Sequence, residues 1–197
     1  AILDGESAIF SYIIGKRKID RFEKQIVADL KTIGYDIKSI DIKKPKRDGL
    51  GGKVISVQEN HLKSYTDQLE MSQGMYRALS LILQLEYSIK LGLPSCILID
   101  DIGEGLDYER SQALIKLIVD RAENTNLQVI MTTNDRFVMN SVDLKYWHII
   151  GRSSGSTRFY NINNSPDTFQ TFYMMGLNNF EFFQSKYYEG INILNEQ

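Results

Sequence analysis

The chain has 197 residues, of which 43% are hydrophobic and 24% charged, with a formal net charge of −2 at pH 7. These values are typical of a globular protein with one domain-sized core and room for an appendage, and they give no global indication of nucleic-acid binding. No apolar run approaches the ~20 residues that span a bilayer, and no signal peptide opens the chain, so we expect a cytoplasmic protein without a membrane partner. The single cysteine, Cys96, excludes an internal disulfide framework, and we expect it to be a small buried hydrophobe.

The first 68 residues predict a helix followed by a β-hairpin. Residues 1–15 are mostly apolar and fit either a strand or a helix. Apolar side chains at spacings of three and four predict an amphipathic helix over residues 18–34. Residues 35–42 and 52–58 predict the two strands of the hairpin.

Residues 43–47, Lys-Lys-Pro-Lys-Arg, predict a basic turn between these strands. It is either a solvated loop or a small patch for the phosphate backbone of DNA or RNA. Residues 49–54 come nearest to a phosphate-binding P-loop, but Arg47 stands at the position of the first glycine and Val54 lacks the hydroxyl that Mg²⁺ requires. We therefore interpret residues 49–54, and likewise Gly15-Lys16, as ordinary turns.

An apolar run over residues 96–99 ends in the adjacent carboxylates of Asp100 and Asp101. A strand this apolar is typical of a parallel sheet covered on both faces. Ligands bind at the carboxyl edge of such sheets, and paired carboxylates there suit a bound Mg²⁺ and an activated water. A strand end with two solvated aspartates is the alternative.

The segments on either side of this strand favour a nucleotide site. Ser72 is a good N-cap for an apolar helix over residues 72–92, whose free N–H groups would suit a phosphate. A helix over residues 108–124 leads to a second apolar strand, which begins at Leu127 and ends in four polar residues. Two buried strands with a helix between them predict neighbouring parallel strands of one sheet.

The remaining chain predicts strands over residues 146–151 and 155–162, and then an aromatic-rich tail after Pro166. Aromatic side chains at this density need burial. The tail therefore either packs onto the preceding domain or forms a surface for a partner protein.

The order of these motifs over residues 69–150 resembles the second half of an ABC-type ATPase head. The branch it resembles is the soluble one, which includes the chromosome-maintenance, recombination-protein-F-like and overcoming-lysogenization-defect-type ATPases of the AAA family. The resemblance implies the C-terminal lobe of a parallel-sheet P-loop NTPase of α/β class, with helices on both faces and an aromatic-rich C-terminal appendage. We expect three segments: residues 1–68, leading to the signature; residues 69–162, the ATPase lobe; and residues 163–197, the appendage.

The resemblance also implies site residues. Residues 71–75 are similar to the signature motif, residues 105–107 look like the D-loop, and Asp100 falls on the Walker B aspartate. The implied roles are nucleotide binding for Ser72, Gln73, Gly74 and Asp107, contact with Mg²⁺ through water for Asp100, and catalysis for Asp101 and Asn134.

The chain departs from the family pattern in its catalytic positions. Asp101 stands where Glu is usual, and misplacement of a base by about 1 Å costs roughly a hundredfold in rate. Asn134 stands where His is usual and carries no proton at neutral pH. Gln73 and Met75 replace the usual Gly and Gln of the signature. We therefore expect slow or conditional hydrolysis.

The implied function is an ATP-binding, ATP-hydrolysing head that dimerises around ATP and Mg²⁺. Its turnover would gate a partner effector or a nucleic-acid activity, in DNA repair or phage defence. The alternatives are a nucleotide-sensing structural dimerisation module with little hydrolysis, and a nucleic-acid-binding domain that uses the basic turn. The partners would be a second copy of the head and an N-terminal P-loop half that is absent here, so we expect this chain alone to bind nucleotide poorly and to be inactive.

Overall fold

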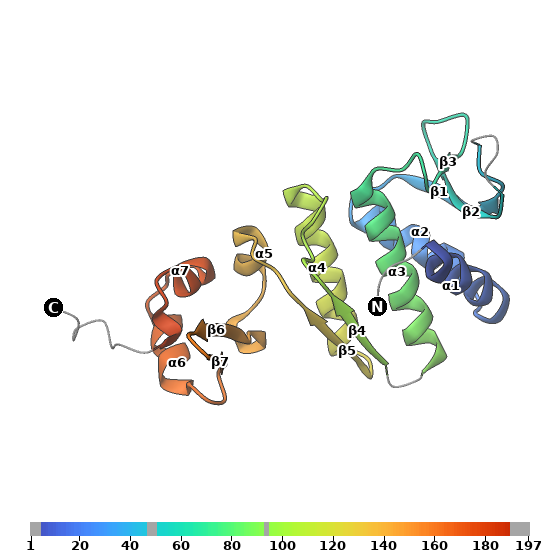
Figure 1. Ribbon diagram of the computed structural model, residues 1–197. Helices are drawn as coiled ribbons and strands as arrows, with labels where there is room; N and C mark the ends of the chain where they lie inside the picture. Colours follow the sequence, from blue (N-terminus) through green and yellow to red (C-terminus); the bar gives the residue numbers. More distant parts are fainter. Residues whose placement is uncertain (1–4, 47–50, 93–94, 190–197) are drawn as a thin grey trace. The chain divides into compact units, whose positions relative to one another are not determined.

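The computed structural model describes residues 5–46, 51–92 and 95–189 (Figure 1). The chain forms two compact units, residues 1–133 and residues 134–197. The segment 69–162, expected as one lobe, contributes to both units. Among the described residues, no helix combines the length and the apolar character needed to cross a bilayer.

The first unit opens with two helices, α1 (Gly5–Lys18) and α2 (Phe22–Thr32), which both contact the long helix α3 (Gln73–Leu91). The Tyr12 hydroxyl on α1 lies 2.6 Å from the carbonyl oxygen of Ile40 and 3.0 Å from a carboxylate oxygen of Glu23, and its single hydrogen can be donated to either. Burial raises the pKa of Tyr12 to about 12, so the phenol stays protonated and keeps donating. This contact ties α1 to α2 and to the sheet.

The predicted hairpin is confirmed as β1 (Ile37–Lys43) paired antiparallel with β2 (Val54–Glu59), to which the short β3 (Thr66–Asp67) adds. Two cations of the basic turn are engaged locally. Lys43 lies 4.0 Å from the ring of Tyr65, and Lys46 forms an ion pair with Glu70 at 2.6 Å. Residues 47–50, including Arg47, lie outside the described residues.

Helix α3 (Gln73–Leu91) is confirmed with its predicted caps. The Ser72 hydroxyl caps its start, and Gly92 ends it in the left-handed conformation, with φ 64°. The helix is buried around much of its circumference, because α1 and α2 pack on it.

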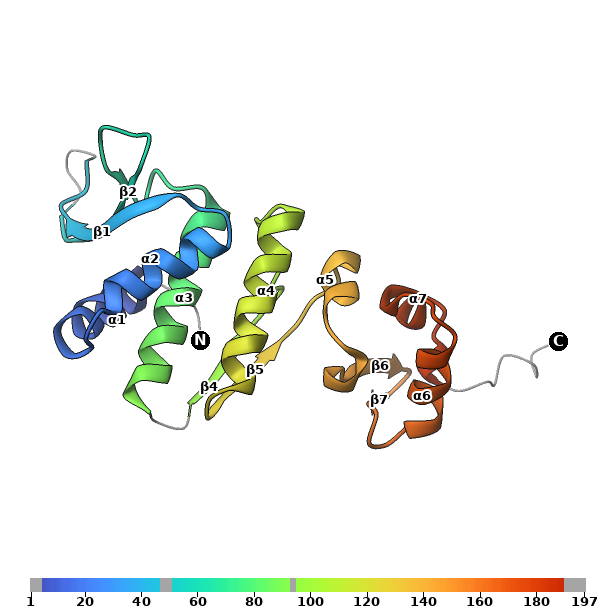
Figure 2. The same cartoon turned by 180° about the vertical axis from the view of Figure 1, so that it is seen from behind.

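The central strands are β4 (Ser95–Ile99) and β5 (Leu127–Met131), which pair in parallel with Ile97 opposite Val129. They are joined by α4 (Tyr108–Glu123), which packs on β5 (Figure 2). A parallel pair with a helical connection is the βαβ arrangement that the sequence predicts. The α/β fold class with a parallel sheet is thereby confirmed.

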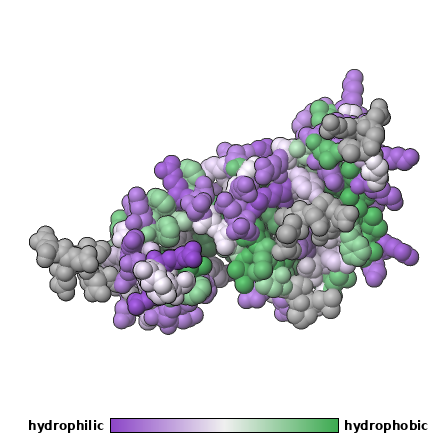
Figure 3. All heavy atoms as spheres, in the orientation of Figure 1, coloured by the Kyte–Doolittle hydropathy of each residue, from purple (hydrophilic) through white to green (hydrophobic). Residues whose placement is uncertain are grey.

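The expectation that the central strand is buried on both faces is wrong for this chain. Ile97 and Ile99 are buried, but Leu98 is 54% exposed and Ile130 on β5 is 50% exposed. Figure 3 shows hydrophobic residues at the surface over β4 and β5. Cys96 is also exposed, contrary to the expectation of a buried hydrophobe, because within the described ranges no element covers this face.

A buried ion cluster joins three helices of the first unit. Arg121 of α4 lies 3.0 Å from Oδ1 of Asp29 on α2 and 3.4 Å from Oε1 of Glu86 on α3. The Glu86 side chain is 0% exposed, and burial raises the pKa of its carboxyl group above the usual value. The cluster joins α2, α3 and α4, and Arg121 keeps Asp29 as its partner when Glu86 is neutral.

The second unit holds the residues from Asn134 onward and has its own aromatic core. Phe169, Phe172 and Phe182 are fully buried, with ring centroids 4.6 Å apart for Phe172 and Phe182. The tail thus obtains its burial by packing with residues 144–162 of the same unit, as the partly buried Tyr160 and Trp147 indicate. The elements are α5 (Arg136–Ser141), η1 (Leu144–Tyr146), β6 (Ile149–Ser153), β7 (Ser156–Tyr160), α6 (Pro166–Met174), α7 (Asn179–Gln184) and η2 (Tyr187–Glu189).

The raised pKa of Glu86 predicts a pH-dependent stability. Because the folded state holds the Glu86 proton more tightly than the unfolded state, the stability this group contributes is present below pH 4.5 and declines as the pH rises through the folded pKa. We expect Glu86→Gln to remove this decline, so that the variant gains stability relative to the wild type between pH 4.5 and pH 7. Urea unfolding of the 197-residue chain at both pH values measures the difference.

Asp120→Asn, at an exposed position of α4, is the control for removing one negative charge from the surface. Equal pH dependence in the wild type and in Glu86→Gln would contradict the prediction.

Candidate functional site

The start of α3 lies beside the turn that follows β4 in the first unit, and Ser72 and Asp100 are exposed there. The Ser72 oxygen accepts the N–H of Met75 at 3.2 Å, which leaves the hydroxyl hydrogen to donate to another acceptor. Gln73 is also exposed, whereas Gly74 is buried. Ser72 thus lies at an accessible helix N-terminus, where N–H groups and the helix dipole favour an anion.

Gly74 is buried because the backbone of the turn before α4 lies directly against it. A Cβ atom at position 74 would lie 2.1 Å from the carbonyl oxygen of Gly105, which no real side chain tolerates. Gly105 itself has φ 77°, in the left-handed region that favours glycine. The signature-like and D-loop-like segments are therefore in backbone contact within one chain.

Thr132, one residue beyond β5, organises the acidic strand end. Its hydroxyl donates to Oδ1 of Asp100 at 2.5 Å and accepts the backbone N–H of Asp101 at 3.0 Å. Its own backbone N–H donates to the carbonyl of Ile99 at 2.9 Å, which extends the contact between the strands by one residue. The sequence places polar residues after both strands, but it does not single out Thr132; the parallel register would have identified it.

Asp101 lies in a turn held by Arg77 of α3. Its φ of 47° is in the left-handed region, which disfavours residues with a Cβ by roughly 1–2 kcal/mol. Arg77 donates to the carbonyl oxygens of Asp100 and Asp101, the latter at 2.8 Å, and pairs with Glu104 at 3.0 Å. The sequence analysis missed Arg77, although it lies three residues after Gly74 and so on the same face of the helix.

Asp107 is the N-cap of α4. Its carboxylate accepts the backbone N–H of Arg110 at 2.9 Å and also pairs with the Arg110 guanidinium. These hydrogen bonds, the backbone one first, lower the pKa of Asp107 below its usual value. The observed contacts are those of a helix cap, and nucleotide binding by Asp107 stays a prediction.

Asn134 is the first residue of the second unit and is exposed. Asp100 and Asp101 belong to the first unit, so a catalytic role shared with Asn134 stays a prediction. The next residue, Asp135, caps α5 by accepting the N–H groups of Phe137 at 2.7 Å and Val138 at 3.0 Å.

The donor set at the strand end fits a weakly held Mg²⁺. Within the part of the chain that is described, no three His, Cys, Asp or Glu side chains gather into a metal-binding group. Mg²⁺ keeps several waters and commonly uses one or two protein carboxylates together with substrate phosphates. An exposed Asp100 supported by Thr132 meets that requirement, and a preformed metal cage is not needed.

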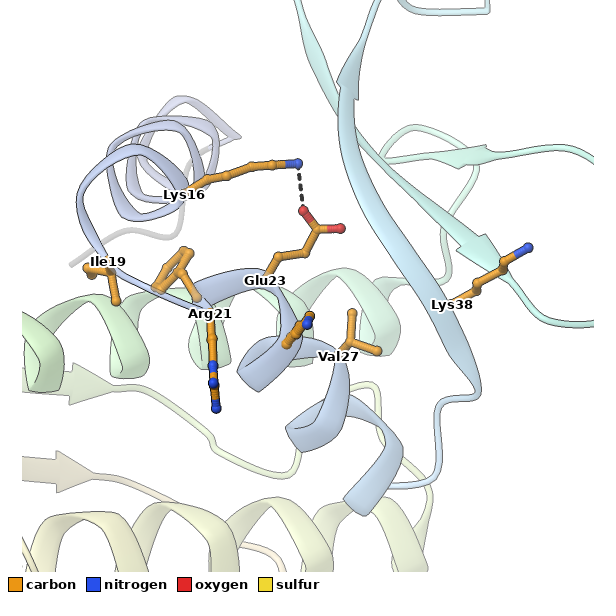
Figure 4. Close-up of a pocket in the computed structure, with 8 residues that line it drawn as sticks. Lys16, Ile19, Arg21, Glu23, Val27 and Lys38 are labelled. Carbon is orange, nitrogen blue, oxygen red and sulfur yellow. Dashed lines mark ion pairs between the residues drawn. The ribbon is translucent and has the colours of Figure 1, made fainter.

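A cavity of about 450 Å³ lies in the first unit among residues of α1, α2 and β1 (Figure 4). Its lining includes four cationic side chains. Lys16 is paired with Glu23 at 2.5 Å, and Figure 4 shows Arg21 and Lys38 pointing away from this pair in different directions. Because the cations do not converge, this cavity is not the candidate site.

Comparison with known proteins identifies a fold and no family. No family model matches the sequence. No curated protein matches it either. Among solved structures, the chain is similar to heads of SMC ATPases. One, from work on ATP-driven dimerization and DNA-stimulated activation of SMC ATPases, has a TM-score of 0.54 at 18% identity, over 77% of this chain and 88% of that one.

Two further structures give the same fold. A Pyrococcus furiosus Smc head with an extended coiled coil, bound to the C-terminal domain of ScpA, has a TM-score of 0.54 at 16% identity, over 80% of this chain. An Smc head bound to the C-winged helix domain of ScpA has a TM-score of 0.52 at 18% identity, over 75% of this chain. The matched regions span 39% and 45% of those two chains. The chain therefore has the fold of an SMC-like ATPase head.

The contact at Gly74 predicts an inverted effect of a common substitution. Gly→Ala inside a helix ordinarily stabilises by about 1 kcal/mol. At Gly74 the added methyl would push α3 away from Gly105, so we expect Gly74→Ala to destabilise the chain by about 1–3 kcal/mol, as overpacking does. Urea unfolding measures the change. Gly51→Ala is the matched control, because a Cβ there meets nothing within 4 Å; a stabilising Gly74→Ala would contradict the described contact.

Proposed function

We propose that this chain is part of an ATP-binding, ATP-hydrolysing head that dimerises around ATP. The observation that carries the proposal is the pairing, in one unit, of an exposed helix N-terminus at Ser72 with an acidic strand end at Asp100 and Asp101. The fold similarity supports it, since one similar structure comes from work on ATP-driven dimerization. A helix terminus for phosphate beside carboxylates for metal and water meets the chemical needs of phosphoryl transfer.

In this proposal each nucleotide lies between two copies of the head. The Ser72 hydroxyl, Gln73 and the N–H groups at the start of α3 face the γ-phosphate of the nucleotide held by the other copy. Gly74 allows the close approach of this helix end to the turn at Gly105. Asp107, which follows that turn, lies where the two sites would meet.

The reaction proposed is hydrolysis by in-line attack. The oxygen of water attacks the γ-phosphorus, the bond from that phosphorus to the β–γ bridging oxygen breaks, and ADP and inorganic phosphate form. Asp101 orients the water and accepts its proton, which then passes to solvent, while Asn134 hydrogen-bonds near the γ-phosphate. A bound Mg²⁺ would supply charge neutralisation, and Asp100 would hold it through water.

The open face of the parallel strands supports a further lobe. Among the described strands β4 pairs only with β5, and a two-stranded sheet is marginal alone. Leu98 and Ile130 leave half their surface in solvent on this face. We propose that a segment bearing the P-loop, on the same or another polypeptide, covers this face and completes the nucleotide site.

The downstream role we propose is to gate a partner protein or a nucleic acid. The similar structures include heads bound to ScpA domains and one from work on DNA-stimulated activation. If the dimer closes around ATP and opens after hydrolysis, a partner would meet a different surface in each state.

A second candidate is a nucleotide-sensing dimerisation module with little hydrolysis. Its support is the short Asp101 side chain in a left-handed turn, and an amide rather than an imidazole at Asn134. ATP-dependent dimerisation of the full-length protein without phosphate release would select this candidate over the first.

Asp101→Asn in the full-length protein tests the first candidate. We expect the rate of phosphate release to fall at least about a hundredfold, because the amide neither takes a proton nor orients water as a base. ATP-dependent dimerisation, measured by light scattering, should persist. Asp120→Asn on the surface of α4 is the matched control, and hydrolysis by Asp101→Asn at the wild-type rate would remove Asp101 from the mechanism.

Leu98→Lys tests the proposed lobe. The side chain is already 54% exposed, so we expect the first unit to stay folded while the full-length protein loses ATP binding, because the charge would be buried under the covering segment. Calorimetric titration with ATP measures the loss. Leu62→Lys, at a position 44% exposed near β2, is the control, and unchanged ATP affinity in Leu98→Lys would contradict a lobe on this face.

A further inference from the structure

The geometry points to Arg77 as a positioning residue that couples the two nucleotide sites of the dimer, an inference that rests on the proposed function. Arg77 is not part of the expected signature, Walker B or D-loop residues. Its side chain is 16% exposed and spans from α3 to the turn after β4. It therefore connects the helix that would contact the partner's nucleotide with the turn that carries Asp101.

Arg77 of α3 contacts the turn after β4 at three points. The Arg77 guanidinium donates to two consecutive carbonyl oxygens, those of Asp100 and Asp101, and pairs with the Glu104 carboxylate. A planar guanidinium offers five N–H donors in a fixed fork, so these contacts restrain the turn in orientation as well as position. Lysine, with one compact ammonium group, cannot reproduce this geometry.

The backbone of the turn at Asp101 has an unfavourable conformation. Asp101 adopts a left-handed conformation that an isolated chain disfavours, so the surrounding contacts must hold it. Arg77 holds the turn by donating to its carbonyl oxygens, and Thr132 holds it by accepting the Asp101 N–H. A small displacement of Arg77 therefore changes where the Asp101 carboxylate points.

The start of α3, which would face a phosphate, is also in direct contact with the turn at Gly105. Ser72 and Arg77 lie within the first turns of one helix. The backbone of this helix at Gly74 packs directly against the backbone of the turn at Gly105. In the proposed dimer, Ser72 contacts the nucleotide of the partner copy, whereas Asp101 acts on the nucleotide of its own copy. Arg77 thereby links occupancy of one site to the geometry of the other.

The expected behaviour is positive cooperativity in ATP hydrolysis. With two coupled sites, we expect a Hill coefficient of about 1.5–2 in the full-length protein, since coupling between sites typically changes affinity roughly 5–150-fold. Arg77→Lys should lower the coefficient to about 1 and reduce kcat. Arg21→Lys, an exposed arginine before α2, is the matched control and should leave both unchanged.

A second readout separates coupling from a purely structural role. A non-hydrolysable ATP analogue should slow amide hydrogen exchange in the wild type at residues 72–77 and also at residues 101–104. In Arg77→Lys the protection at the start of the helix should remain and that of the turn should be lost. Unfolding midpoints of the variants show whether they fold; if Arg77→Lys does not, Glu104→Gln, which keeps Arg77 and weakens its anchor, should lower the Hill coefficient partway.

The possible results are distinct. Retained cooperativity together with retained protection of the turn in Arg77→Lys would overturn the role of Arg77 and leave the proposed ATPase intact. Wild-type hydrolysis with a Hill coefficient of about 1 would do the same. Absence of ATP binding and turnover in the full-length wild type would instead overturn the proposed function, and this inference with it.

Discussion

The backbone contact between Gly74 and Gly105 is the constraint on which the candidate site depends. A carbonyl oxygen lies where a Cβ atom would be, so no side chain can separate the start of α3 from the turn before α4. The helix N-terminus that suits a phosphate therefore lies directly against the turn that follows Asp100 and Asp101.

In the first unit, the interior charges lie between packed helices, whereas the exposed apolar side chains lie on the parallel strands. Arg121 joins Asp29 and Glu86 where three helices pack, so the interior charge fixes the helices relative to one another. On the parallel strands, the apolar side chains of Leu98 and Ile130 are about half exposed, with no cover from the described part of the chain. Fully burying such a side chain contributes roughly 1.5–3 kcal/mol, and covering these half-exposed side chains would contribute roughly half of that each, so this face favours association with an apolar lobe.

The sequence predicted α2, α3, α4 and the two parallel strands, because their signals are local: helical spacing, caps at Ser72 and Gly92, and apolar runs ending in polar residues. It left α1 open, since residues 1–15 fit a strand as well as a helix. It did not predict α5, since six residues are too few for a periodic pattern, although Asp135 is a readable cap. The exposure of Cys96 could not be predicted, because an apolar strand gives the same pattern whether its cover lies in the chain or elsewhere. Arg77 was missed because its contacts cross from a helix to a turn 24 residues away.

The shorter acid at position 101 is consistent with the turn that holds it. Aspartate tolerates the left-handed region better than longer or branched residues, because its short polar side chain can hydrogen-bond locally. The turn presents the carbonyls of Asp100 and Asp101 to one guanidinium, and its conformation therefore suits aspartate. Compared with glutamate, the aspartate side chain is one methylene shorter and reaches less far toward a water. With so little reach in the side chain, the position of the carboxylate depends on the turn, and the turn depends on Arg77 and Thr132. Control of hydrolysis would then lie in the backbone of this turn rather than in the acidity of the base.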